Sequence, residues 1–283
     1  MPPKRNGTTR QTPTGTRRQN GNGAHRQTAL ITGGSGGIGL EIGKQLARRS
    51  YDLVLVARTR DALEAVAGQI EGKQDVKVHV FAADLRRREA PEELFDFLRN
   101  ENIPIEILVN NAGFGLGGEF ADTDVQRELE MIQVNIVALT HLTKLFLPAM
   151  IKAKAGRILN LASTAAFQPG PLMAVYYATK AYVLSFSEAL AEELRHSGVT
   201  VTALCPGPTR SDFAAVAHVG ESRLFSLFGL ADATEVAEYG VNAMLHGRRV
   251  AIPGLRNKIV AQANRFAPRA VTAKVARIAQ ESR

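Results

Sequence analysis

The sequence predicts an α/β protein with a single doubly wound parallel sheet of about seven strands and helices on both faces. Three observations support this class: short apolar runs alternate with helical patterns, several runs are apolar throughout, and a glycine-rich turn links the first run to a helix. Alternation of this kind implies parallel strands joined by right-handed crossovers. Continuous apolar runs indicate strands that helices cover on both sides.

The expected elements follow one another along residues 28–254. Asp61 is the expected N-cap of the second helix, and Asn135 lies among apolar neighbours in the fourth. The expected strands are residues 28–31, 52–57, 76–82, 105–109, 157–161, 199–205 and 249–252. The expected helices are residues 40–49, 61–72, 90–100, 124–152, 176–195 and 234–246.

Residues 212–230 fit no single regular element, because large apolar side chains such as Phe213 and Phe228 stand among small and polar residues. A lid over a substrate pocket, beside the end of a strand, would explain this pattern. An ordinary amphipathic helix packed on the core explains it equally well.

The composition is ordinary for a soluble protein, with 45% hydrophobic and 22% charged residues among 283. No uninterrupted apolar run approaches the ~20 residues that span a membrane. The single cysteine, Cys205, has no partner for an internal disulfide and lies in an apolar strand pattern. We therefore expect a packing role for Cys205 and a reducing compartment, the cytoplasm.

The net charge of +8 is concentrated at the two ends of the chain. Residues 1–27 carry +6 and no acid, residues 256–283 carry another +6, and residues 28–255 carry −4. The first 27 residues have too few apolar side chains to form a core, so we expect a disordered basic tail. It also lacks the apolar stretch of a secretory signal. Attraction to anions or nucleic acid is a less favoured interpretation.

The last segment, residues 255–283, mixes basic residues with large apolar ones and predicts a basic amphipathic extension. We expect it to be helical and to pack mainly on protein, near the substrate entrance. Peripheral contact with an anionic membrane is an expected secondary role, because basic amphipathic helices bind such surfaces. The chain therefore divides into a tail at 1–27, a sheet domain at 28–254 and an extension at 255–283.

The glycine-rich turn is the sequence TGGSGGIG at residues 32–39. Glycines allow positive φ and a close approach of the backbone to a ligand, and the N-terminus of the following helix attracts phosphate. A flexible linker is the plain alternative. The flanking strand and helix favour a cradle for the pyrophosphate of a dinucleotide.

The end of the second strand indicates which dinucleotide binds. Ala57 and Arg58 stand where an acidic residue would bind the ribose hydroxyls of NAD. An arginine there accommodates a 2′-phosphate, and the Ser35 hydroxyl can add a contact to it. Arg58 therefore favours NADP, although an arginine in a loop can also be a solvated surface charge.

Ser163, Tyr176 and Lys180 are the candidate catalytic residues. Ser163 follows the fifth strand, at the edge of a parallel sheet where ligands bind. Tyr176 and Lys180 are four residues apart, which places both on one face of a helix. A cation near a tyrosine lowers its pKa from ~10 and makes it a better acid–base catalyst. A surface pair is the alternative for this spacing taken alone.

Over about residues 27–254 the chain resembles the short-chain dehydrogenase/reductase family, whose fold is of the Rossmann type. Four motifs occur in the family's order: the turn at 32–39, Asp84 as the adenine-side aspartate, Asn-Asn-Ala-Gly at 110–113, and the Pro-Gly pair at 206–207. The step of thirteen residues from the candidate serine to the candidate tyrosine also fits.

The resemblance implies a catalytic tetrad of Asn135, Ser163, Tyr176 and Lys180. Tyr176 would donate a proton to the carbonyl oxygen that Ser163 hydrogen-bonds, while hydride arrives from the nicotinamide. Lys180 would lower the pKa of the tyrosine and bind the nicotinamide ribose, and Asn135 would hold a water for proton resupply.

The resemblance also implies a set of cofactor contacts. One departure concerns the threonine that the family often places after Pro-Gly: Ser211 fits that spacing best, and Thr209 is a second choice. The implied contacts are Gly33, Ser35, Gly37, Ile38, Gly39, Arg58, Asp84, Leu85, Asn111, Ala112, Gly113, Tyr176, Lys180, Pro206, Gly207, Thr209 and Ser211.

These observations predict an NADP(H)-dependent oxidoreductase acting on a ketone or secondary alcohol, with an apolar substrate because phenylalanines follow Ser211. The expected partners are that small molecule and a second copy of the chain, in a dimer or tetramer built on the long helices bearing Asn135 and Tyr176. No metal site is expected, and nucleic-acid binding is not favoured. A non-catalytic NADP-binding sensor or scaffold, using its basic tails on membrane or nucleic acid, is the alternative.

Overall fold

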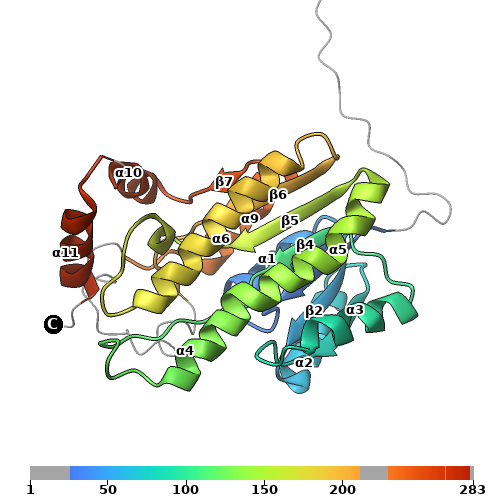
Figure 1. Cartoon of the computed structure of the whole chain (residues 1–283). Coiled ribbons are helices and arrows are strands. Elements are labelled where there is room, and N and C mark those ends of the chain that lie inside the picture. The colour runs from blue at the N-terminus through green and yellow to red at the C-terminus, as the bar shows by residue number, and fades with distance from the viewer. Residues whose placement is uncertain (1–25, 211–228, 265, 281–283) are drawn as a thin grey trace, which may run out of the picture.

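The computed structural model describes residues 26–210, 229–264 and 266–280. Within them, seven parallel strands form one sheet in the order β3-β2-β1-β4-β5-β6-β7, which confirms the predicted fold class (Figure 1). The strands are β1 (Thr28–Thr32), β2 (Asp52–Ala57), β3 (Val78–Ala82), β4 (Ile107–Asn110), β5 (Gly156–Leu161), β6 (Val199–Leu204) and β7 (Val250–Ala251).

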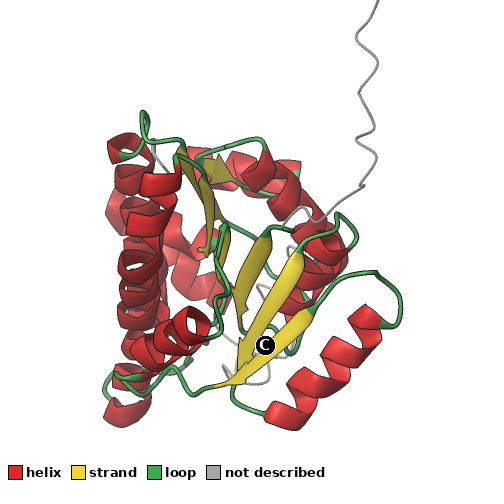
Figure 2. Ribbon diagram, turned by 90° about the vertical axis from the view of Figure 1, so that its right-hand side faces the viewer, coloured by secondary structure: helices red, strands yellow, loops and turns green. Residues whose placement is uncertain are grey.

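Helices cover both faces of this sheet, as Figure 2 shows. The core below one face packs the strands against α1, α2 and α9, and the core below the other packs them against α3, α5 and α6. The helical segments are α1 (Gly37–Ala47), α2 (Arg60–Glu71), α3 (Ala90–Asn100), α4 (Val125–Ile132), η1 (Gln133–Ala138), α5 (Leu139–Ala153), η2 (Thr164–Phe167), α6 (Ala174–Glu193), α9 (Ala233–Leu245), α10 (Leu255–Ala263) and α11 (Arg269–Gln280).

Alternating side chains of the central strands supply the two cores. In β1, Ile31 belongs to the core with α1, while Leu30 belongs to the core with α5; in β2, Leu55 and Val54 divide in the same way. This follows from the two-residue period of a strand. Since both faces are buried, both sets of side chains are apolar, which is why these strands are continuous apolar runs.

The sheet has a switch point between β1 and β4. The chain proceeds outward from β1 to β2 and β3, and then returns to pair β4 with the other edge of β1. The loops that leave β1 and β4 therefore diverge and leave a crevice at the carboxyl ends of these strands. Ligands bind at such a crevice in doubly wound sheets.

The helix predicted at residues 124–152 is continuous but contains a π-helical stretch, η1. It begins at Val125, and the carboxylate of Asp124 caps it by accepting a hydrogen bond from the backbone N–H of Arg127 at 2.8 Å. Its 29 residues are apolar enough to cross a membrane, but 44% of the most apolar window is buried inside the protein. This burial is typical of a core helix, so length and composition alone do not indicate a membrane span.

Several boundaries differ from those predicted. Helix α2 has Thr59 at the N-cap, and Asp61 lies in its first turn instead. Strand β4 extends to Asn110, whose amide donates to the side chains of Asn160 at 2.9 Å and Thr143 at 3.1 Å. This pairing lets a polar residue continue a buried strand. The extension forms two helices, α10 and α11, and the predicted lid segment lies almost wholly outside the described residues.

Candidate active site and cofactor cleft

The glycine turn after β1 is a tight cradle at the N-terminus of α1. Gly33 and Gly37 have φ values of +68° and +54°, which residues with a Cβ rarely adopt. A Cβ on Gly39 would lie 2.3 Å from the carbonyl oxygen of Gly33, so only glycine allows the helix to start this close to the turn. A turn of this kind suits a phosphate group, which the N–H groups of a helix N-terminus attract.

Thr32 and Asn111 join this turn to the end of β4. The Thr32 hydroxyl accepts hydrogen bonds at 3.0 Å from the backbone N–H groups of both Asn111 and Ala112. The Asn111 amide donates to the carbonyl oxygens of Thr32 at 2.9 Å and Gly33 at 3.2 Å. Sequence reasoning did not assign Thr32 a role, and the only available signal was its place as the first residue of the turn.

Charged residues gather where the adenosine half of a dinucleotide would lie. Arg58 is exposed just beyond β2, and it lines the same cavity as Ser35 and Asp84. The carboxylate of Asp84 is held by the guanidinium of Arg86, whose Nε lies 2.9 and 3.0 Å from its two oxygens. This pairing, with a smaller contribution from Arg58, lowers the pKa of Asp84. Arg86 is a cavity-lining residue that sequence reasoning missed.

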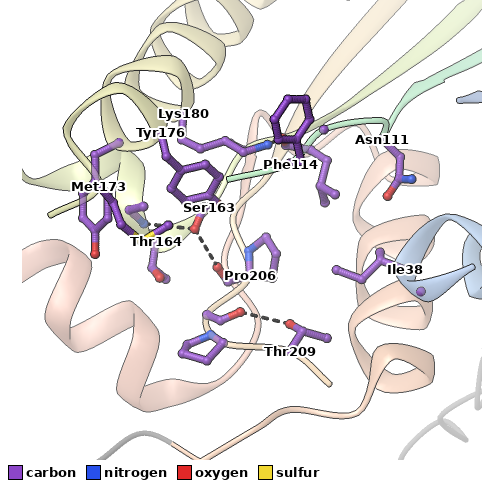
Figure 3. Close-up of a pocket in the computed structure, with 18 of the residues that line it drawn as sticks. Ile38, Asn111, Phe114, Ser163, Thr164, Met173, Tyr176, Lys180, Pro206 and Thr209 are labelled. Atoms are coloured by element: carbon purple, nitrogen blue, oxygen red, sulfur yellow. Dashed lines mark hydrogen bonds between the residues drawn. The ribbon is translucent and has the colours of Figure 1, made fainter. Parts of the chain in front are cut away.

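Ser163 and Tyr176 meet in the centre of the cleft. Ser163 caps η2, accepting from the backbone N–H of Ala165 at 3.1 Å, and its hydroxyl donates to the carbonyl oxygen of Pro206 at 3.4 Å. A further hydrogen bond joins the Ser163 and Tyr176 side chains. In Figure 3 these two residues and Lys180 lie together, across the pocket from Ile38.

Lys180 is buried one helical turn after Tyr176. Its ammonium donates to the carbonyl oxygen of Leu161 at 2.8 Å and lies 5.8 Å from the centre of the Tyr176 ring. Burial lowers the pKa of Lys180 to about 8. Burial also raises the pKa of Tyr176, against the smaller opposing effect of the hydrogen bond to Ser163. The lowering of the Tyr176 pKa that the sequence predicted for Lys180 is therefore not found, because burial dominates the pKa of this tyrosine.

Asn135 lies in the π-helical stretch, and such stretches are frequent at functional sites. Its amide donates to the carbonyl oxygen of Phe114 and the hydroxyl of Thr179, both at 3.0 Å, and its Oδ1 accepts from the N–H of Phe114 at 3.1 Å. The side chain is 1% exposed and ties the loop after β4 to α6. Its expected water-holding role stays a prediction.

One cavity of about 880 Å³ connects the glycine turn, the Ser163–Tyr176 pair and the C-terminal helices. Gly39 and Asn135, two of the predicted site residues, are not among the residues that line it, and Ser211 lies outside the described residues. Thr209, whose hydroxyl donates to the carbonyl oxygen of Gly207 at 2.9 Å, lines the cavity. The other predicted residues that line it are Gly33, Ser35, Gly37, Ile38, Arg58, Asp84, Leu85, Asn111, Ala112, Gly113, Ser163, Tyr176, Lys180, Pro206 and Gly207.

The C-terminal helices form a wall of this cavity. The sequence predicted only that this extension packs near the substrate entrance. Asn257 of α10 packs so closely on Gly207 that a Cβ there would lie 2.7 Å from its Oδ1. From α11, Thr272, Ala276 and Gln280 are buried against the cavity. Their spacing of four residues was the available signal, since it marks one helical face.

Comparison with known proteins agrees with this fold. The family model described as short chain dehydrogenase matches residues 27–221. The chain therefore belongs to the short-chain dehydrogenase family and is an oxidoreductase whose cofactor is a nicotinamide dinucleotide.

Three proteins illustrate the similarity. A short-chain dehydrogenase from Sphingobium yanoikuyae, solved in complex with NADPH, is 33% identical with a TM-score of 0.76, covering 85% of this chain and 94% of its own. A bulky-bulky ketone specific alcohol dehydrogenase from Comamonas testosteroni is 31% identical with a TM-score of 0.72, covering 85% and 92%. A very-long-chain 3-oxoacyl-CoA reductase from Anas platyrhynchos is 35% identical over 63% of this chain, which spans 58% of that relative.

Proposed function

We propose that this protein transfers hydride between NADP(H) and a bulky, apolar ketone or secondary alcohol, with Tyr176 as the proton donor. The observation that carries the proposal is the hydrogen-bonded pair of Ser163 and Tyr176, in the same cavity as the glycine turn. When bound, the nicotinamide supplies or accepts the hydride. The protein then has to bind the carbonyl oxygen and move one proton.

Tyr176 and Ser163 act on the carbonyl oxygen. The Tyr176 hydroxyl donates its proton to that oxygen, and Ser163 hydrogen-bonds it as negative charge develops. A raised pKa keeps Tyr176 protonated before the reaction, which suits a proton donor in the reducing direction. The buried ammonium of Lys180 places positive charge behind the ring, where it favours the phenolate that proton transfer leaves.

Arg58 and Ser35 support NADP as the cofactor over NAD. Both line the cavity beside the glycine turn, and β2 ends in Ala57 where an acid would bind the ribose hydroxyls. A guanidinium and a hydroxyl are suited to a 2′-phosphate. The similar Sphingobium yanoikuyae protein was solved with NADPH, which supports the same choice.

The substrate end of the cavity supports a bulky apolar ketone. Phe114, Met173 and Tyr177 line it near Tyr176, and valines and alanines of α10 and α11 continue it outward. Such a lining binds through apolar burial, leaving recognition of the carbonyl to Ser163 and the tyrosine. The names of the Comamonas testosteroni and Anas platyrhynchos relatives, for a bulky-bulky ketone and a very-long-chain 3-oxoacyl-CoA, are consistent with this class.

The proposed assembly is a homo-oligomer in the cytoplasm. Exposed apolar side chains on the continuous helix of α4, η1 and α5 support the oligomer: Val125 is 71% exposed, Leu129 54% and Val137 38%.

Peripheral membrane contact is a secondary proposal, supported by exposed Ile259 and Phe266 among the basic residues of the extension. Binding to anionic vesicles should then be lost on deletion of residues 256–283, and equal binding without them would contradict it.

The test is NADPH oxidation by the full-length protein across ketones of graded size. We expect turnover that increases from small ketones to bulky apolar ones, because the latter fill the apolar part of the cavity. A protein that binds NADPH but reduces no ketone in the series would contradict the proposal. That result would instead favour the non-catalytic sensor.

A further inference from the structure

Helix α11 forms one wall of the substrate end of the cavity. Its side chains at Val271, Thr272, Val275, Ala276 and Ala279 line the cavity, at spacings that place them along one side of the helix. Figure 1 shows α11 as the last helix, outside the layer that contains α6. The far wall of the pocket is therefore supplied by residues about a hundred positions after the candidate catalytic pair.

Two polar contacts hold α11 in this place. Gln280 Nε2 donates to the hydroxyl of Tyr177 at 2.5 Å, and Arg277 forms an ion pair with Glu119 at 2.6 Å. The ring of Tyr177 packs edge-on against that of Tyr176, with 6.1 Å between centroids. Tyr177 therefore connects α11 to the ring of Tyr176.

Val271 and Val275 have an unusual combination of properties. Both line the cavity, yet they are 51% and 61% exposed. The wall that they form therefore continues from the inside of the cavity to the surface. Val260 and Ala263 of α10 line the same cavity. A small ketone held at Tyr176 would leave both valines in water, whereas a longer apolar ligand would cover them.

We propose that Val271 and Val275 form a subsite for an elongated apolar arm of the ketone and determine the preference for chain length. This inference rests on the proposed ketone reduction and names the substrate class more narrowly. The carbonyl lies at Ser163 and Tyr176, and the arm extends along α11 toward solvent. Since the subsite lies away from the reacting atoms, it contributes to binding of the arm and not to the chemical step.

Ile278 provides a matched control on the same helix. Its exposed fraction of 55% is similar to those of the two valines, but it does not line the cavity. The variants are the double substitution Val271→Ser with Val275→Ser, and the single substitution Ile278→Ser. All three positions are at the surface, so the fold should persist, and circular dichroism checks this.

The first measurement is kcat/KM with saturating NADPH for methyl ketones of increasing chain length. In the native protein kcat/KM should rise with length. The double variant should lose about tenfold for the longest ketone, through KM, and keep the native value for the shortest; tenfold corresponds to about 1.4 kcal/mol. Ile278→Ser should match the native protein. The same length dependence in all three proteins, or an equal loss in Ile278→Ser, would overturn the subsite.

The second measurement is hydrogen exchange of α11 in the presence of NADP⁺ and the longest ketone, a mixture in which no hydride is available to reduce it. The ketone should slow exchange in the native protein and in Ile278→Ser, but not in the double variant. Equal protection in the double variant would overturn the inference. If the native protein reduced no ketone, the proposed function would fail, and this binding experiment would still decide whether the subsite exists.

Discussion

The side chain of Gln280 donates a hydrogen bond to the hydroxyl of Tyr177 at 2.5 Å, across 103 residues of sequence. Both residues are buried, at 7% and 5% exposure. The contact links the last described helix to the residue that follows the candidate proton donor. The position of α11 and the shape of the substrate pocket are therefore coupled.

Tyr177→Phe should destabilise the protein by about 1 to 3 kcal/mol, because it leaves the buried Gln280 amide without its acceptor. The free energy of unfolding from urea denaturation measures the loss. Tyr182→Phe is the control, since the Tyr182 hydroxyl also bonds a side chain, Thr140 at 3.0 Å, but at an exposed position. Equal stability changes in the two variants would contradict the prediction.

Tyr176→Phe should bind NADPH with native affinity and lose turnover by roughly 10² to 10⁴-fold, the usual contribution of a general acid. The ring stays in its apolar cluster, so the fold and the cofactor cleft should be kept. Fluorescence titration of NADPH and steady-state kinetics measure the two properties. A variant with turnover close to native would show that another group supplies the proton.

Arg58→Asp should weaken binding of NADPH relative to NADH by at least about tenfold, because it removes a charge-assisted hydrogen bond to the 2′-phosphate. Dissociation constants for both cofactors measure the preference. The control is Arg60→Asp, an equal change of charge at an exposed position that does not line the cavity. If the native protein bound the two cofactors equally well, the assignment of Arg58 would be wrong.

The pH dependence of activity should report Lys180. Burial lowers its pKa from 10.5 to about 8, so the side chain loses its positive charge as the pH rises through about 8. We expect kcat/KM for NADPH, which reports the free enzyme, to fall above that pH. In Lys180→Arg the guanidinium stays charged, so the decrease of kcat/KM above about pH 8 should disappear. If the same decrease occurred in Lys180→Arg, a group other than Lys180 would be responsible for it.

The native protein should be a dimer or tetramer by light scattering at micromolar concentration. Leu129→Glu, on the exposed apolar side of α4, should shift the mass toward the monomer, because the carboxylate would be buried without a partner. Ile259→Glu introduces the same charge at an exposed apolar position of α10 and serves as the control. A monomeric native protein would contradict the proposed oligomer.

Much of the fold follows from local patterns that a single sequence displays. The apolar run at 52–57, the glycines at 32–39 and the four-residue step from Tyr176 to Lys180 each specify a conformation or a shared face over a few residues. Once the alternation of strands and helices is recognised, the rule that ligands bind beyond the carboxyl ends of parallel strands brings Ser163 to the cleft. These features were predicted because their physical causes are short in range.

Tertiary structure alone decided the features that depend on contacts between distant segments. The pairing of Arg86 with Glu130, the burial that lowers the pKa of Lys180, and the bond from Gln280 to Tyr177 have no local pattern that predicts them. Burial and hydrogen-bond geometry are set by which elements the completed sheet brings together. Four-residue spacing marked one face of the last helix, but only packing could show that this face forms the wall of the substrate pocket, because a helix carries no information about its partner.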